Sequence, residues 1–587
     1  MSAETRTDAQ RPPPPSSGAA RMERIVRLCK RRGFIFQSAE IYGGLNGVWD
    51  MGPLGAELKR NLKDYWWRVM VRERDDVVGL DGSIITHRAV LKASGHEDTF
   101  SDPMVECRLT NVRLRADQIS EQSGTIYSFY GAFDRGIEEQ FIRDFQAGRG
   151  PSAISITLEA ATVPHPAAAK LAEIQPLLSD SAHRALIERL ITEYTPMRKG
   201  LAERFSVLCT GKRDLAYALQ VAEQFYKKRG VANPHPLLDR WEATTGTRAF
   251  NPENGAELGP PRAFNLMLRT QLGATEDESS VAYLRPETAQ SIFVQFKNVL
   301  DTARKKLPFG IAQIGKAFRN EINPRNFIFR SREFEQMELE YFCAPQRGMQ
   351  LLDYWLEERL KFYDNIGIPR AKLHVLTVPD ADRAFYSKGT YDIEYEFPFG
   401  VQELEGVAYR TDYDLTQHQN ASGKPLEYFD EESKQKFIPH VVEPSAGVDR
   451  TLLALICEAY DEETVTDDKG KSEVRTVMRF HPRMAPIKVG VFPLLKNKPE
   501  LVAKAREVHA LLKPHMMTFY DEGGAIGRRY RRQDEAGTPF GITIDFETLG
   551  ERGDELRDTV TLRHRDSMQQ ERVKIGELLG ILLPQVT

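Results

Sequence analysis

Charged and aromatic residues alternate along one stretch, Phe309–Phe342, in a way that suits a phosphorylated ligand. The pattern predicts a β-hairpin with a long polar loop that turns at Pro324. The polar and aromatic residues that share its predicted faces are Gln313, Arg319, Glu321, Arg332, Phe334, Gln336, Glu338 and Glu340. Arginine grips phosphate with a bidentate fork, a ring stacks on a base for roughly 1–3 kcal/mol, and carboxylates bind amines. We therefore expect a ligand with phosphates, a planar ring and an amine; a solvated hairpin with ladders of salt bridges is the alternative.

Arg450 marks a second candidate phosphate site. Residues 440–443 predict a strand, and the small residues PSAG connect it to a helix whose apolar stripe begins at Val448. Arg450 projects away from that stripe near the start of the helix, where the helix dipole disfavours a cation. A polyanion in front of the helix would explain the arginine. Glu443 and Ser445 lie at the approach to this site.

Three further carboxylates could complete the site. Glu287 is predicted at the end of a strand, where it could bind an ammonium group, although Pro286, Glu287 and Thr288 are also ordinary residues for starting a helix. Glu403 and Glu405 lie two residues apart in a predicted strand and therefore on one face. Beside phosphates they would hold Mg²⁺ through phosphate oxygens. The alternative is one buried carboxylate satisfied by the backbone and one surface carboxylate.

The composition indicates a globular protein of several domains. Its 587 residues predict about four domains at ~150 residues each. The net charge of −4 indicates that any nucleic-acid site is a local patch. Five dispersed cysteines without a CxxC pair indicate a reducing compartment and exclude a zinc site of that kind. Without an apolar membrane span or signal-peptide core, we expect a cytoplasmic protein with no membrane partner.

The elements that must position these residues fall into four regions. Residues 1–21 predict a disordered, Pro-rich tail, and residues 22–119 with 246–483 a catalytic domain whose first long helix runs from about Pro53 to Arg74. Residues 120–245 predict a mostly helical insertion. Residues 484–587 alternate strands and helices, which predicts an α/β domain with a mostly parallel sheet.

The motifs resemble a known family. FRNE with FRSREFEQME resembles motif 2, and EPSAGVDRTLLALI motif 3, of the class II aminoacyl-tRNA synthetases. LRPETAQ, VQELEGVAYRTDYDL, DPMVEC and GRRYRRQDEAGTPFGITIDF are similar to the dimeric glycyl-tRNA synthetases within that class. The resemblance covers about Met22–Val573, interrupted by the insertion. It implies an α+β fold: a six-stranded antiparallel catalytic sheet flanked by helices, a C-terminal anticodon-binding α/β domain, and a homodimer.

The resemblance also implies residue roles. Arg319 and Arg450 would be the catalytic cations, on the α-phosphate and γ-phosphate of ATP, and Glu403 would bind Mg²⁺. The implied ATP-binding residues are Arg319, Asn320, Glu321, Phe329, Arg330, Ser331, Arg332, Glu333, Phe334, Glu403, Leu404, Gly447, Val448, Asp449 and Arg450. The implied glycine-binding residues are Arg115, Glu287, Phe334, Glu335, Gln336, Met337, Glu338, Glu443, Pro444, Ser445, Ala446 and Gly447. Those implied to bind tRNA are Arg528, Arg529, Arg531 and Arg532.

The implied activity is that of a glycine–tRNA ligase. Such an enzyme would activate glycine with ATP and Mg²⁺ and pass the glycyl group to the 3′ end of tRNA(Gly). The sequence departs from the family pattern at Arg88 and Ser291, and residues 251–260 contain no cysteine, so no zinc site is expected there. Two alternatives remain open: a class II synthetase for serine, threonine or alanine, and a synthetase-like ATP- or RNA-binding regulatory protein without ligase activity.

Overall fold

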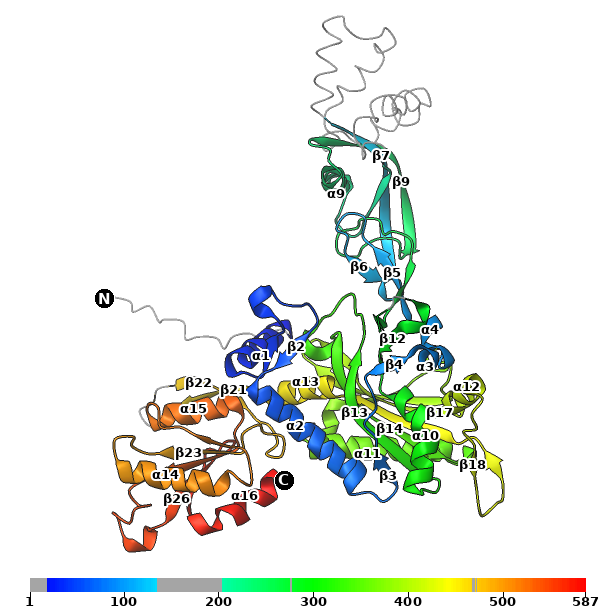
Figure 1. The fold of residues 1–587 in the computed structure, drawn as a ribbon. Coiled ribbons are helices and arrows are strands. Elements are labelled where there is room, and N and C mark those ends of the chain that lie inside the picture. The colour runs from blue at the N-terminus through cyan, green and yellow to red at the C-terminus, as the bar shows by residue number, and fades with distance from the viewer. Residues whose placement is uncertain (1–17, 135–202, 275–276, 467–469, 471) are drawn as a thin grey trace, which may run out of the picture. The chain divides into compact units, whose positions relative to one another are not determined.

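The computed structural model describes residues 18–134, 203–274, 277–466, 470 and 472–587. Backbone contacts divide the chain into two units (Figure 1). One comprises Met1–Phe100 and Leu266–Thr587, and the other Ser101–Asn265. None of the described helices is long and apolar enough to cross a membrane.

A seven-stranded sheet forms the centre of the first unit (Figure 1). Its strands, in spatial order, are β15 (Leu373–Thr377), β16 (Gly389–Phe397), β17 (Gly400–Thr411), β20 (His440–Gly447), β14 (Glu333–Cys343), β13 (Phe309–Phe318) and β3 (Val77–Gly79). Every pair is antiparallel except β13 with β3. The six expected antiparallel strands are therefore present, and a short parallel strand extends one edge.

Helices cover both faces of this sheet because its strands alternate between two sets of side chains. On one face, Met337 and Leu339 of β14 join a core with α2 (Pro53–Trp67), α11 (Gly348–Asn365) and α13 (Val448–Ala459). On the other, α10 (Ala289–Ala303) packs on residues of β13 and β14. Pro53 begins α2 as predicted, and its helical course continues as a π-helical turn, Arg68–Arg72.

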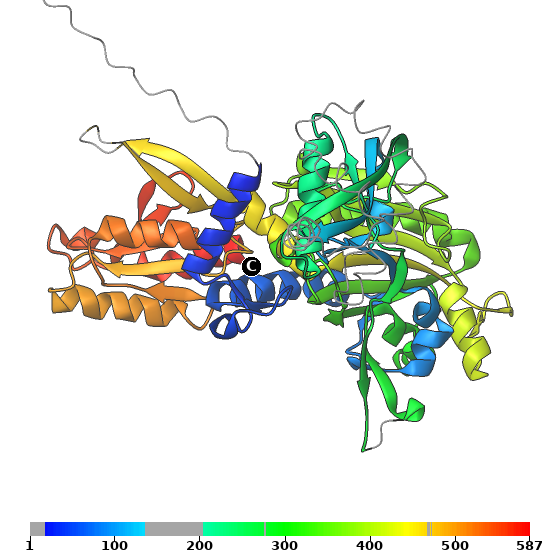
Figure 2. The same ribbon diagram turned by 90° about the horizontal axis from the view of Figure 1, so that it is seen from above.

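Shorter elements complete this part of the unit. The helices are α1 (Gly18–Arg32), α3 (Arg88–Ala93), α4 (His96–Thr99) and α12 (Tyr413–Ser422). The strands are β1 (Ile35–Gln37), β2 (Trp49–Met51), β4 (Ile85–His87), β11 (Leu268–Gln271), β12 (Val281–Leu284), β18 (Tyr428–Phe429), β19 (Lys436–Phe437), β21 (Tyr460–Thr466) and β22 (Ser472–Met478). The β21–β22 ribbon lies beside α15 (Ile526–Ala536) in both views (Figures 1 and 2).

The C-terminal domain has a mixed sheet. Its elements are β23 (Val489–Pro493), α14 (Pro499–Leu512), β24 (Thr518–Tyr520), α15 (Ile526–Ala536), β25 (Phe540–Ile544), β26 (Thr559–His564), β27 (Gln570–Lys574) and α16 (Leu578–Val586). The predicted parallel pairing holds for β23, β24 and β25, and antiparallel pairs with β26 and β27 extend the sheet beyond β25. A short loop joins β26 to β27, and a connection this short returns the chain antiparallel.

The described parts of the predicted helical insertion, residues 120–134 and 203–245, are mostly strand, whereas residues 135–202 lie outside the described residues, so the prediction of a mostly helical insertion stays a prediction. The described elements of the second unit are β5 (Ser101–Glu106), β6 (Arg113–Arg115), β7 (Gln122–Asp134), β8 (Phe205–Cys209), α9 (Leu215–Lys228), β9 (Pro234–Thr247) and β10 (Arg262–Asn265). They form two three-stranded sheets, β10-β5-β6 and β8-β7-β9, with α9 packed on the latter. The helix predicted in RDLAYALQVAEQFYKKRG is confirmed as α9, whereas the helical pattern predicted at residues 165–194 lies outside the described residues.

Candidate active site

The predicted phosphate and amine residues meet in one cavity of about 370 Å³. Strands β14, β17 and β20, the β13–β14 loop and the first turn of α13 contribute to its wall. The lining residues predicted from the sequence are Glu287, Arg319, Glu321, Phe329, Arg330, Ser331, Phe334, Glu335, Gln336, Glu338, Glu403, Leu404, Glu443, Ser445, Gly447, Asp449 and Arg450. Residues that lie up to 163 positions apart therefore face the same space.

The two predicted phosphate arginines are held by different elements. Arg319 follows the last residue of β13, and its Nε donates to the carbonyl of Pro286 at 3.2 Å. Its guanidinium lies 5.3 Å from the ring centre of Phe334. Arg450, in the first turn of α13, pairs with Glu403 at 3.2 Å and lies 4.6 Å from the ring centre of Phe329. Each arginine is thus braced by an aromatic ring beside the cavity.

Three carboxylates of the same cavity, those of Glu287, Glu338 and Glu443, form an acidic niche. Glu338 accepts hydrogen bonds from Thr288 and, at 2.7 Å, from Ser445. Glu443 pairs with Arg410. Burial alone would raise the pKa of Glu287, but the charges of His96 and Arg410 hold that pKa well below its usual range. An ionised carboxylate beside two others is suited to an ammonium group.

Two of the residues that build this niche were missed by the sequence analysis. Arg410 is buried and also donates to both oxygens of Asp414, at 2.8 and 3.0 Å. His96 lies 3.3 Å from Glu287. No local signal could have found either residue. Arg410 lies at the end of strand β17 and Asp414 in the first turn of α12, so the helical i, i+4 rule does not apply to them. Nothing near His96 in the sequence connects it with Glu287.

Lys59 of α2 was missed as well. Its ammonium group pairs with Glu335 at 2.7 Å and with Asp449 at 2.8 Å. Burial would lower the pKa of Lys59, but these two carboxylates raise it above its usual value. Asp449 also accepts a hydrogen bond from the backbone of Glu335 at 2.7 Å. The lysine therefore ties β14 and α13 together behind the cavity.

Glu403 and Glu405 do not share a face, contrary to the prediction. The β16–β17 register shifts between Ile393 and Glu394, which places Leu404 as an extra residue opposite the shift. Glu403 lines the cavity, while Glu405 is buried on the core side against Arg359 at 2.6 Å. The bulge reverses the alternation on which the prediction rested.

Asp392, instead of Glu405, is the second carboxylate beside Glu403 in the cavity. Burial, followed by the charge of Glu403, raises the pKa of Asp392 to about 6. Carboxylate oxygens are the donors that Mg²⁺ prefers. The residues present thus fit a divalent ion that also contacts phosphate oxygens.

Several predicted site residues lie outside the cavity wall. They are Arg115, Asn320, Arg332, Glu333, Met337, Pro444, Ala446 and Val448. Met337 and Ala446 are paired in register and point into the core, because alternation turns them away from the cavity. Arg332 donates to backbone carbonyls, and Arg115 belongs to the second unit, where it pairs with Asp102 at 3.0 Å.

The four arginines of α15 have different environments. Arg529 is 2% exposed and donates to the carbonyls of Pro493 and Gly524, so its predicted contact with tRNA is wrong for this conformation. Arg529 lies on the face of α15 that also carries the buried residues Gln533 and Ala536, and this face packs on the rest of the domain. Arg531 pairs with Glu473 at 2.6 Å and Arg532 with Asp521, whereas Arg528 is exposed.

Comparison with known proteins agrees with this geometry. A family described as the tRNA synthetase class II core domain (G, H, P, S and T) matches residues 273–460, and one described as an anticodon binding domain matches residues 488–584. These matches, the antiparallel sheet and the arginine-lined cavity define a class II synthetase catalytic domain followed by an anticodon-binding domain.

Full-length relatives narrow the class. The chain is 43% identical to a glycine–tRNA ligase of Thermus thermophilus, over 96% of this chain and 98% of the relative. It is also 43% identical to that of Deinococcus radiodurans, over 96% and 98%. The ligase of Rhodopirellula baltica is 41% identical, over 95% and 98%. The chain belongs to the glycine–tRNA ligase family.

Proposed function

We propose that the cavity forms glycyl-adenylate from glycine and ATP, and that the glycyl group then passes to tRNA(Gly). The chief support is the meeting of Arg319, Arg450 and the acidic niche of Glu287, Glu338 and Glu443 in one cavity. Membership of the glycine–tRNA ligase family supports the same activity. The presence of both phosphate arginines and of the acidic residues speaks against the alternative of a synthetase-like regulatory protein without ligase activity.

The reaction needs no protein nucleophile. A glycine carboxylate oxygen attacks the α-phosphorus of ATP, the new P–O bond forms as the bond to the bridging oxygen breaks, and pyrophosphate leaves. A terminal hydroxyl of tRNA then attacks the glycyl carbonyl, and AMP leaves. Positioning and neutralisation of charge supply the rate acceleration in such reactions. In this proposal Arg319 neutralises the α-phosphate and Arg450 the γ-phosphate.

The remaining roles follow from the lining of the cavity. Phe334 would stack on adenine with Arg319 beside it, and Glu321 would accept a hydrogen bond from the adenine amine. Glu403 and Asp392 would hold Mg²⁺. When bound, the ion supplies positive charge to the phosphates. The arginines orient the phosphates from the protein side, and the wall formed by Phe329 limits access of water to them.

Glycine would be selected by its charge and its size. The ammonium group would lie among Glu287, Glu338 and Glu443, and Ser445 narrows the niche through its hydrogen bond to Glu338. Ala408 and Gly406 are small lining residues that let the substrate approach the backbone of β17. In this proposal Ser445 and Glu338, fixed by their hydrogen bond, occupy the space that the side chain of a larger amino acid would need.

Glycine-dependent exchange of pyrophosphate into ATP tests this function. We expect exchange with glycine and at least ~100-fold lower kcat/KM with alanine or serine, because steric overlap adds to the 10–200-fold that one methylene provides. Exchange with another amino acid in preference to glycine would contradict the proposed substrate. No exchange with any amino acid would favour the regulatory protein without ligase activity.

We propose that the exposed side of α15 contributes to tRNA binding through Arg528. Arg528→Ala should weaken binding several-fold and reduce the magnitude of the salt slope by about 1, because one phosphate contact is lost. Arg529→Ala should instead lower the stability of the C-terminal domain, since the buried guanidinium of Arg529 donates to the buried carbonyl of Pro493. Filter binding over a salt series measures the slope, and an unchanged slope in Arg528→Ala would remove this residue from the interface.

Assembly and location are also part of the proposal. The motif resemblance supports a homodimer, and sedimentation of the 66.7 kDa chain tests it, with a single-chain mass as the contrary result. Arg88, which departs from the family pattern, pairs with Glu97 at 2.6 Å. The five cysteines are all free and buried, which fits the reducing cytoplasm; fractionation of cells is the direct measurement.

A further inference from the structure

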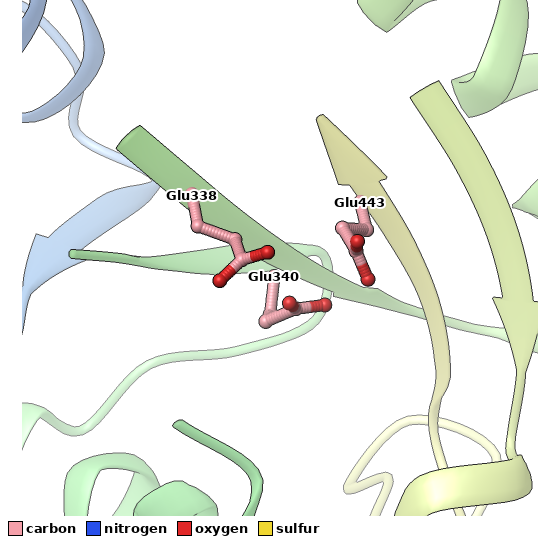
Figure 3. Close-up of side chains that lie close together, drawn as sticks. All are labelled: Glu338, Glu340 and Glu443. Atoms are coloured by element: carbon pink, nitrogen blue, oxygen red, sulfur yellow. The ribbon is translucent and has the colours of Figure 1, made fainter. Parts of the chain in front are cut away.

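Three glutamates on neighbouring strands bring their carboxyl groups together at the wall of the cavity, which two of them line. Glu338 and Glu340 project from β14 and Glu443 from β20, and each has an oxygen within 4.8 Å of the others (Figure 3). Figure 3 shows the three groups pointing toward one another. All three residues are buried. Three negative charges at this separation would repel strongly, because the interior screens poorly.

The hydrogen-bond partners of the three groups are unequal. Glu338 accepts from Thr288 and Ser445, and Glu443 accepts from Arg410. Glu340 is 0% exposed, and neither of its oxygens has a hydrogen-bond partner among the described residues. A buried carboxylate without a donor is far more costly than a buried neutral acid. The proton that relieves the repulsion therefore belongs on Glu340.

The strand register supplies an acceptor for that proton. β14 pairs Glu338 with Ser445 and Tyr341 with Val442 on β20, so Glu340 and Glu443 lie between these two pairs. Cross-strand neighbours on one face of an antiparallel pair have their side chains in reach of each other. Glu443 lines the cavity, whereas Glu340 lies behind it.

We propose that Glu340 is a neutral carboxylic acid whose O–H donates to the carboxylate of Glu443, and that it is a positioning residue for recognition of the substrate ammonium. Glu443 is then held by two donors, Arg410 from one side and Glu340 from the other. The cluster keeps two negative charges, which Arg410 and an incoming ammonium can balance. This inference rests on the proposed role of Glu338 and Glu443 in binding glycine.

Burial raises the pKa of all three carboxyl groups, to about 8 for Glu443, whose pKa the charge and the hydrogen bond of Arg410 lower. Glu340 has no such hydrogen bond among the described residues, so the geometry favours Glu340 as the protonated member. Burial, followed by the charge of Glu443, raises the pKa of Glu340 well above its usual value. The charged groups that face Glu340 are Glu338 on β14, Glu443 on β20, Arg410 on β17 and Asp414 on α12. Arg410 is the one cation in that set, and it already pairs with Glu443 and Asp414. Rising pH should remove the proton, so that Glu340 no longer donates to Glu443 but repels it, and glycine binding should weaken because Glu443 leaves its position.

Two substitutions of Glu340 distinguish the effect of losing its proton donor from the effect of changing its packing volume. Glu340→Gln keeps the shape and a donor, so its KM for glycine should stay within about threefold of the unsubstituted chain at neutral pH. Glu340→Leu keeps the volume without a donor, and its KM for glycine should rise roughly ten- to a hundredfold while the KM for ATP is unchanged. Glu396→Gln, an exposed carboxylate on β16, is the control and should change neither value.

The pH profile and the infrared spectrum test the proton itself. In the unsubstituted chain, kcat/KM for glycine should fall as pH rises through the pKa of Glu340, and Glu340→Gln should lack that step while keeping the pH dependence caused by deprotonation of Glu443 and of the substrate ammonium. One protonated-carboxyl stretching band should disappear in Glu340→Gln and persist in Glu396→Gln. Circular dichroism identifies a leucine variant that fails to fold, in which case the glutamine variant and the infrared band decide the matter.

Three results would overturn the inference. An infrared spectrum unchanged in Glu340→Gln would show that Glu340 carries no proton. A pH profile unchanged by the same substitution would remove its role in glycine binding. Stoichiometric binding of Mn²⁺, measured without ATP and lost in Glu340→Gln, would show a cation in place of the proton. The infrared and Mn²⁺ measurements need no substrate, so they remain informative even if glycine-dependent exchange is absent.

Discussion

Arg319→Ala should lower the kcat of glycine-dependent pyrophosphate exchange by about 10²–10³, the usual loss when one donor to a developing charge is removed. The alanine variant cannot neutralise the α-phosphate as the bond to glycine forms. Because the interaction strengthens in the transition state, we expect the loss mainly in kcat, with a smaller rise in the KM for ATP. Steady-state exchange at varied ATP separates the two parameters.

Arg325→Ala is the matched control for this substitution. Arg325 is an exposed arginine of the same β13–β14 loop, and it is not among the lining residues of the cavity. Its replacement should leave exchange within about twofold of the unsubstituted rate, as expected for an exposed residue outside the site. Equal losses in both variants would indicate an effect of net charge, and full activity in Arg319→Ala would remove Arg319 from the mechanism.

Arg359→Ala should destabilise the catalytic domain by about 3–5 kcal/mol, because it leaves Glu405 as an unpaired buried charge. Arg359 of α11 and Glu405 of β17 are each 1% exposed at the side chain and lie 2.6 Å apart. Oxygen Oε2 of Glu405 and a terminal nitrogen of Arg359 lack hydrogen-bond partners among the described residues. No other described donor to Oε2 would therefore compensate for the loss of Arg359. Urea unfolding of the full chain, followed by exchange activity and circular dichroism, measures the loss.

An exposed pair and a double substitution give the controls. Arg370→Ala breaks the pair with Glu357, whose side chains are 57% and 55% exposed, and should cost less than about 1 kcal/mol. Arg359→Met combined with Glu405→Leu should recover most of the stability, since an apolar pair carries no desolvation penalty. An alanine variant as stable as the unsubstituted chain would show that water reaches Glu405.

Prediction from the sequence succeeded where the pattern was local and the register unbroken. The strands on either side of the Pro324 loop, the helix that begins at Pro53 and the helix that carries Arg450 were all expected and are present as β13, β14, α2 and α13. Alternation along β14 placed Gln336 and Glu338 on the cavity face correctly, whereas Met337, which the family resemblance had added to the glycine site, points into the core.

Prediction failed where a distant element or an irregularity intervened. The bulge near Leu404 turned Glu405 into the core, and β26 and β27 added antiparallel pairs to the parallel part of the C-terminal sheet. The family resemblance implied that Arg529 contacts tRNA, but the carbonyl of Pro493, 36 residues away, binds it in the interior. Only the packing of one element on another decides such partners.

The sequence by itself determined which functional groups are available and, through motif spacing, the family to which they belong. Residue type and period are local properties of the chain, so they can be read without coordinates. Tertiary structure alone decided that Arg410 and His96 support the acidic niche and that Glu340 is enclosed without a donor. Burial and charge compensation depend on every element packed around a group, and these elements come from positions far apart in the chain.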